Sequence, residues 1–372
     1  MGQADNSGFV SGSKNGFILA ALSLIITVAR VDSRASDLTG NATSIPIGFS
    51  SLEFVDTPAS DSSLSSTLSI AESFRTLWGS VEGTQGAFDW TFLDSETGRA
   101  TQANKDIILR VISGGVNVPS WVFGLGVQTF SYLDTNPYSP NYGQQLTMAV
   151  PWDPTMLQYK KDLIRAIGVK YASNPFVKVV GASAANSSSD DWSLPHSPTD
   201  ISNWRKAGYT AQKMIDACEQ IIDETMADFP NQAVVMAFNT NGGLDQLNKN
   251  AKPNYVQSRV IAYARTKYGR RFIAQFNTLS ATTPTAQNVP AENILSTIQA
   301  GGRPISGQML WYVTGDPTCR MARSSPCDSV ETLRTAVITG LGYNTRYQEI
   351  YCLDLLNPQL QPMLTKWVDR FK

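Results

Sequence analysis

A helix followed by a strand is most clearly encoded in VPWDPTMLQYKKDLIRAIGVKYASNPFVKVVGAS, residues 150–183. Asp153 is a good N-cap, and Pro154 suits the first helical position, where a backbone N–H would have no helical partner. Through residues 154–171 the apolar side chains recur at helical spacing and form one broad face. The short Val-rich run at 177–182 then predicts a buried strand. This stretch therefore predicts a helix that packs against a sheet.

The same alternation of strand and helix extends along the chain in both directions. Further helices are expected at 200–229, ended by Pro230, and at 328–341 and 358–371. Strands that alternate with helices form a parallel sheet covered by helices. We expect strands at eight short runs rich in Val, Ile and Phe: 45–54, 74–81, 107–112, 177–182, 233–238, 271–276, 305–312 and 347–353.

The number of strands favours a closed barrel over an open sheet. Eight strands in a chain of 372 residues fit one (β/α)8 TIM barrel with long βα loops. The alternative is an open doubly wound sheet, which usually carries a Gly-rich phosphate turn after its first strand. Here the first predicted strand leads into FSSLEFVDT, without such a turn. We predict an α/β fold with a single barrel domain over residues 36–372.

The N-terminal segment has the pattern of a signal peptide. Lys14 precedes an apolar run at 17–29, and Ser33 and Ala35 follow as small residues suited to cleavage. The run is too short to span a bilayer comfortably. The alternatives are a buried helix and an uncleaved anchor. We predict that residues 1–35 are a signal peptide or targeting segment, and that the protein is secreted, extracellular or periplasmic.

Composition and charge narrow the class of partner. The formal net charge is -1, which argues against a nucleic-acid binder and gives no reason to bind an anionic membrane. Only 16% of the residues are charged, so uncharged polar residues fill the surface, as is common in extracellular sugar-binding proteins. We expect a carbohydrate partner, no nucleic acid and no membrane contact after signal removal. The oligomeric state is left open.

The cysteines and the single histidine limit the chemistry. Cys319 and Cys327 lie in a Pro- and Ser-rich loop and are expected to form a disulfide. Cys218 and Cys352 are expected to be buried and free. Because His196 is the only histidine, a His-based metal site or a Ser-His-Asp triad is excluded unless His196 itself takes part. We expect no metal and no cofactor.

Two segments resemble a known family of barrels. RTLWGSVEGTQGAFDWTFLD (75–94), followed by DIILRVISGGVNVPSWVFGLG (106–126), resembles the second strand, second helix and third strand of certain glycoside hydrolases. These belong to the large (β/α)8-barrel clan that contains β-galactosidases and cellulases. Residues 150–183 resemble their third helix and fourth strand. The resemblance implies a glycosidase that cleaves a β-linked glycan through two carboxylates at the C-terminal face of the barrel.

The chain departs from that family at both usual catalytic positions. The resemblance places one Glu after the fourth strand, often following Asn, and one Glu at the end of the seventh. Here Asn186 is followed by Ser187, and the nearest carboxylates are Asp190 and Asp191. At the seventh strand stands Gln308, which can bind a hydroxyl but cannot attack carbon. We take Asp191 as the candidate acid, although adjacent Asp residues in a Ser-rich loop are also common in solvated turns.

Two glutamates are candidates for the second carboxylate. Strand alternation puts Glu349 on the same side as Tyr351, and the expected direction is into the barrel. A buried Glu is costly unless it is functional or paired, so the alternative is an ion pair with Arg110 or Arg346. Glu53, at the end of the first strand, is the other candidate. Glu82 belongs to the family-like motif and is expected to be structural.

Aromatic and amide side chains at strand ends are the candidates for sugar contacts. Trp121 follows the third strand and either stacks on a sugar ring or packs its loop onto the barrel. Amides both donate to and accept from hydroxyl groups. The missing Asn-Glu pair favours a second hypothesis, a non-catalytic barrel that binds glycan or builds an extracellular assembly. The candidate substrate-binding residues are Trp121, Gln308, Trp311, Asn239, Asn277, Tyr351, Arg110 and His196.

Overall fold

The structure, a computed structural model, describes residues 44–186, 191–240, 242–248 and 252–371. The expected signal segment and Asp190 lie outside these ranges. All of the described residues belong to one structural unit. Within the described ranges, no helix is both long enough and apolar enough to cross a membrane.

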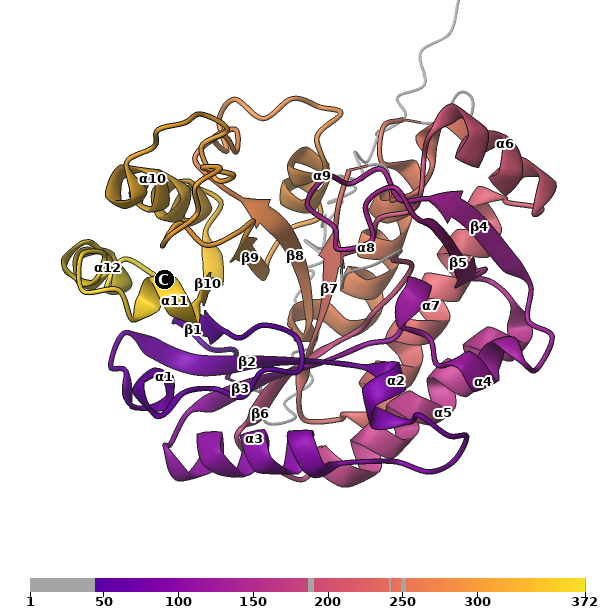
Figure 1. The fold of residues 1–372 in the computed structure, drawn as a ribbon, viewed down its shortest axis with the longest axis horizontal. Coiled ribbons are helices and arrows are strands. Elements are labelled where there is room, and N and C mark those ends of the chain that lie inside the picture. The colour runs from indigo at the N-terminus through magenta and orange to yellow at the C-terminus, as the bar shows by residue number, and fades with distance from the viewer. Residues whose placement is uncertain (1–43, 187–190, 241, 249–251, 372) are drawn as a thin grey trace, which may run out of the picture. The chain divides into compact units, whose positions relative to one another are not determined.

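Eight parallel strands close into a barrel, which confirms the predicted fold class (Figure 1). The strands are hydrogen-bonded in the order β1-β10-β9-β8-β7-β6-β3-β2, and β2 pairs with β1 to close the ring. In chain order they are β1 (Gly48–Leu52), β2 (Ser69–Leu77), β3 (Asp106–Ile112), β6 (Val177–Gly181), β7 (Ala233–Phe238), β8 (Phe272–Leu279), β9 (Ile305–Met309) and β10 (Thr345–Tyr351).

Helices surround the barrel (Figure 1). Along the chain they follow its strands. The helix predicted at 154–171 begins and ends as expected, with the Asp153 side chain accepting from the Met156 N–H at 2.9 Å. The longer helices are α3 (Thr91–Gln102), α5 (Pro154–Tyr171), α6 (Pro198–Lys206), α7 (Ala211–Asp228), α8 (Tyr255–Tyr268), α10 (Ser329–Gly342) and α12 (Gln361–Val368). Shorter ones are α1 (Asp61–Ser65), α2 (Trp78–Val81), α4 (Ser120–Phe123), α9 (Ile294–Ala300) and α11 (Cys352–Leu355).

Several predicted boundaries are wrong. The single helix expected at 200–229 is two helices, α6 and α7, because the chain turns at Gly208, whose φ of +77° suits glycine. The second strand begins at residue 69, earlier than expected, because its first half carries polar side chains that hide the strand pattern. Residues 78–81 form α2, and Cys352 begins α11.

An antiparallel hairpin in the loop that follows β3 was not predicted. It pairs β4 (Thr129–Leu133) with β5 (Gln145–Ala149). Its Phe130 ring stacks on Trp204 of α6 with the ring centroids 3.6 Å apart, and Figure 1 shows the hairpin beside α6. The hairpin is thereby held on the side of the barrel where the strands end.

Candidate functional site

Glu349 points into the barrel, as strand alternation predicted, and forms an ion pair there. Its Oε2 lies 2.9 Å from Nη1 of Arg110, the ion pair that the sequence left open as an alternative. The same oxygen accepts from the Gln275 amide at 2.8 Å, and Oε1 accepts from the Ser73 hydroxyl at 2.6 Å. Glu349 is 0% exposed, so both oxygens of this carboxylate are occupied inside the barrel.

Two of the predicted amides belong to the same network. Gln308 Oε1 accepts from Arg110 at 3.3 Å, and Asn277 Oδ1 accepts from the Gln275 amide at 2.7 Å. Gly181 leaves room for Arg110, because a Cβ at that position would lie 2.9 Å from the arginine Cγ. Side chains from several strands therefore build a polar layer across the barrel, which we call the floor: Ser73, Arg110, Gln275, Asn277, Gln308 and Glu349.

Four aromatic rings lie at the C-terminal ends of neighbouring strands, and we call them the mouth cluster: Phe54, Trp311, Tyr312 and Tyr351. Trp311 and Tyr312 follow β9, Phe54 follows β1, and Tyr351 ends β10. The centroids of Trp311 and Tyr312 are 4.8 Å apart, and those of Trp311 and Tyr351 are 5.7 Å apart. Trp311 and Tyr351 were predicted site residues. Phe54 and Tyr312 were missed, although each is an aromatic residue just beyond a strand end.

An arginine beside the mouth cluster was also missed. Arg320, in the loop after β9, places its guanidinium carbon 4.7 Å from the Trp311 ring centroid and 4.2 Å from that of Tyr138. Tyr138 lies in the β4–β5 loop and is 53% exposed. Asp191 is half-buried in the loop after β6, and its charge acts on Arg320. Asp191, the candidate acid, thus lies in a loop at the C-terminal end of the barrel, which we call the rim, and its charge acts on Arg320.

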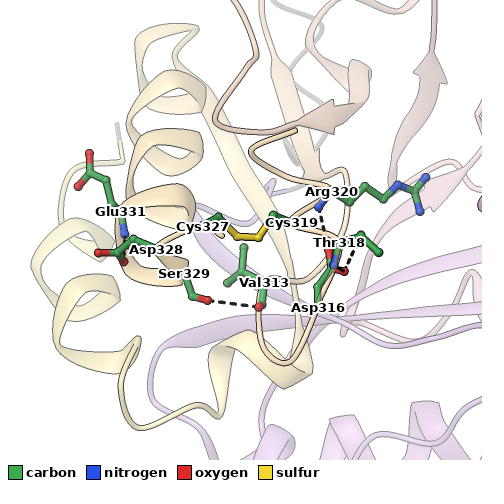
Figure 2. Close-up of a disulfide and its surroundings, with 9 residues drawn as sticks. All are labelled: Val313, Asp316, Thr318, Cys319, Arg320, Cys327, Asp328, Ser329 and Glu331. Atoms are coloured by element: carbon green, nitrogen blue, oxygen red, sulfur yellow. Dashed lines mark hydrogen bonds between the residues drawn. A yellow bond between two sulfur atoms is a disulfide. The ribbon is translucent and has the colours of Figure 1, made fainter. Parts of the chain in front are cut away.

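The loop that carries Arg320 is closed by the predicted disulfide. Cys319 and Cys327 are bonded, with their Cα atoms 5.7 Å apart (Figure 2). Cys218 is free and buried, as expected. Cys352 is free but only half-buried, because it begins α11 and does not lie within the last strand.

Glu53 lies behind the barrel wall, beside a second glutamate. Its Oε1 is 3.2 Å from the Ser51 hydroxyl and 3.1 Å from that of Ser63, and the Ser63 hydroxyl is also 3.2 Å from Glu72 Oε2. Burial raises the pKa of Glu53. Burial, and secondarily the Glu53 charge, raises the pKa of Glu72 to about 8. Glu53 is therefore part of a buried acidic pair, and among the described residues no hydrogen bond joins its carboxylate to the floor.

Replacing Glu72 with Gln is expected to change the pH dependence of stability. In the unfolded chain the Glu72 pKa is near its ordinary value of 4.5, and in the folded protein it is about 8. The folded state therefore holds a proton that the unfolded state has lost, and stability falls as the pH rises from about 5 to 8. The contribution approaches about 1.4 kcal/mol per pH unit. In E72Q, the free energy of unfolding from urea titrations should fall less steeply.

Matched measurements on E331Q provide the control, because Glu331 is exposed on α10 and pairs only at the surface. That variant should keep the wild-type slope between pH 5 and 8. Parallel stability curves for E72Q and the wild type would show that Glu72 ionises normally in the fold.

The remaining predicted residues make other contacts. Trp121 donates to the Glu82 carbonyl at 2.9 Å and packs edge-on against Trp78, so it takes the packing role. Glu82 accepts from the Trp78 indole at 2.8 Å, which is the structural role expected of it. Asn239 Oδ1 accepts from the N–H of its neighbour Thr240, and His196 is an exposed loop residue.

Comparison with known proteins finds similarity at the level of fold. No known family model matches the sequence, and no curated protein matches it either. The catalytic domain of β-amylase from Paenibacillus polymyxa superposes with a TM-score of 0.56 at 9% identity, over 88% of this chain and 100% of that one. The two chains therefore share a fold, which in this protein is the closed barrel of eight parallel strands described above. The resemblance indicated by the sequence motifs is thus confirmed at the level of fold.

Two xylanases are among the other similar structures. A GH10 endoxylanase from a sugarcane soil metagenome has a TM-score of 0.49 at 11% identity, over 82% of this chain and 85% of that one. Xylanase 10B from Thermotoga maritima has a TM-score of 0.48 at 8% identity, over 87% of this chain and 96% of that one.

Proposed function

We propose that this protein binds a carbohydrate chain at the C-terminal mouth of its glycosidase-type barrel. The observation that carries the proposal is the mouth cluster, four aromatic rings gathered where the strands of the barrel end. Loops at this face form the site in barrel enzymes. An aromatic face packs well on the apolar C–H face of a sugar ring. The amides of the floor, Gln308 and Asn277, suit sugar hydroxyls because they both donate and accept.

Hydrolysis of a β-linked glycan is the second candidate, and it would require two carboxylates. Asp191 at the rim is the candidate general acid, and Glu349 in the floor is the candidate partner. For Glu349 to act on a substrate, however, it would have to leave Arg110 and become exposed. Binding without hydrolysis requires no such rearrangement, and for this reason we place binding first. Secretion is part of the proposal, and the Cys319–Cys327 disulfide supports it.

Replacing Trp311 with Ala is expected to weaken glycan binding at least about tenfold. The substitution removes the central ring of the mouth cluster, and burying a large apolar side chain contributes about 1.5–3 kcal/mol. The measurement is calorimetric titration of the 36–372 chain with a panel of neutral and acidic oligosaccharides. F88A is the control, because Phe88 stacks on Trp90 away from the mouth cluster.

The same protein decides between the two candidates when aryl glycosides and polysaccharides are assayed for turnover. Turnover that is lost in both D191N and E349Q would establish hydrolysis. Binding without turnover would establish the non-catalytic function. The proposal fails if no glycan in the panel binds, or if W311A binds as tightly as the wild type.

A further inference from the structure

The loop that carries Arg320 is held rigidly at the mouth. The carboxylate of Asp316 accepts from the Thr318 N–H, the Thr318 hydroxyl and the Arg320 N–H at 2.9, 2.7 and 2.9 Å. The disulfide closes the same loop one residue before Arg320. Figure 2 shows the Arg320 side chain extending away from both the disulfide and Asp316. The backbone at Arg320 is therefore held by Asp316 and the disulfide, while the Arg320 guanidinium extends away from both.

The guanidinium lies between rings from opposite sides of the barrel. Tyr138 belongs to the loop after β3, and Trp311 belongs to the loop after β9, which lies four strands away around the eight-stranded ring. The guanidinium carbon is 4.2 and 4.7 Å from the two ring centroids. Both distances are within cation–π range, so the guanidinium bridges two loops that follow opposite strands of the barrel.

Within the part of the chain that the structure describes, the Arg320 side chain donates no hydrogen bond, whereas its backbone N–H donates to Asp316. Among the described residues, no carboxylate forms a salt bridge with Arg320, and Asp316 binds its backbone N–H and not its side chain. Burial lowers the pKa of Arg320, whereas the charges of Asp191 and Asp316 act in the opposite direction. An arginine remains charged under such shifts, since its ordinary pKa is above 12. A partly buried cation, whose side-chain N–H groups have no hydrogen-bond acceptor among the described residues, thus lies beside the rings proposed to bind sugar.

We propose that Arg320 binds an anionic group, a carboxylate or a sulfate, on an acidic glycan whose sugar rings lie against the mouth cluster. A planar guanidinium binds such a group through two parallel N–H bonds, and stacking fixes its orientation in advance. The inference rests on the proposed function, because it names the class of glycan that the mouth takes. The negative charge of Asp191 acts on the same guanidinium and opposes an incoming anion, so it limits the affinity.

Three probes test the inference by calorimetric titration: xylotetraose, tetragalacturonate and a sulfated carrageenan tetrasaccharide. The wild type is expected to bind one or both acidic probes at least about tenfold more tightly than xylotetraose, and added salt should weaken that binding. A carboxylate ligand is indicated if tetragalacturonate binds best, and a sulfate ligand if the carrageenan probe binds best.

Variants separate this site from the sugar-binding surface as a whole. R320Q should lose at least about tenfold in affinity for the preferred acidic probe and less than about twofold for xylotetraose. R320K should recover part of the loss, because it restores the charge without the planar fork. D191N should bind the acidic probe more tightly than the wild type. W311A should weaken all the probes that bind.

The inference is overturned if the wild type binds xylotetraose as tightly as both acidic probes, or if R320Q keeps the wild-type affinity for the acidic probe. Either result leaves the proposed function intact, provided that W311A still reduces binding. If none of the probes binds at all, the proposed function fails together with the inference. Unfolding curves of R320Q that match the wild type ensure that any loss arises at the site.

Discussion

Replacing Arg110 with Met is expected to lower the free energy of unfolding by about 3–5 kcal/mol. The substitution leaves the Glu349 carboxylate inside the barrel at 0% exposure without the cation that lies 2.9 Å from it. Gln308 and Gln275 also lose a donor. The measurement is denaturant unfolding of the 36–372 chain, followed by fluorescence and circular dichroism.

A double variant isolates the role of the charge. R110M/E349L removes both members of the pair and is expected to be more stable than R110M alone, because no unpaired charge is left in the barrel. R165M is the matched control. Arg165 also pairs with carboxylates, but its side chain is 50% exposed, and surface pairs contribute about 1 kcal/mol or less. If R110M is no less stable than R165M, the ion pair does not hold the floor together.

Replacing Asp354 with Ala is expected to lower the free energy of unfolding by about 2–4 kcal/mol. Asp354, in α11, is 0% exposed, and its carboxylate accepts from the N–H groups of Val313 and Thr314 at 2.9–3.1 Å. These two residues directly follow Trp311 and Tyr312. Without the carboxylate, both N–H groups lose their acceptor, and the turn that positions the mouth cluster loosens. Glycan affinity should therefore fall together with stability.

D354N is the control, because asparagine has nearly the same size and shape as aspartate. Asparagine keeps one oxygen of the same reach, so D354N should retain most of the stability that D354A loses. Denaturant unfolding and the same glycan titrations measure both effects. A D354A protein within about 0.5 kcal/mol of the wild type would show that this carboxylate does not hold the turn.

Local patterns explain why the barrel could be predicted. In a strand or a helix the apolar residues recur at a characteristic spacing along the sequence, as they do from Asp153 onward in α5 and β6. The exceptions are segments where polar side chains interrupt the pattern. In β2, Glu72 and Ser73 are both buried. Glu72 contacts Ser63 outside the barrel, whereas Ser73 contacts Glu349 in the floor, so polar residues occupy both faces of the strand and hide its pattern.

The candidate site was predicted only where the position of a residue on its strand is sufficient. Trp311 and Tyr351 follow or end strands, and the ends of parallel strands meet at one face. Arg320 and Tyr138 could not be found in this way, because they lie in long loops more than one hundred residues apart in sequence. Their contact depends on how two loops fold over the mouth.

By itself the sequence determined the closed barrel, the disulfide and the inward direction of Glu349, since each depends on neighbours along the chain. Only the tertiary structure showed that Glu349 forms an ion pair with Arg110 inside the barrel. It also separated Glu53, directed behind the wall, from the floor, and it brought Arg320 to Tyr138. The reason is physical: these outcomes depend on distances between strands and loops, and no local period along the chain encodes them.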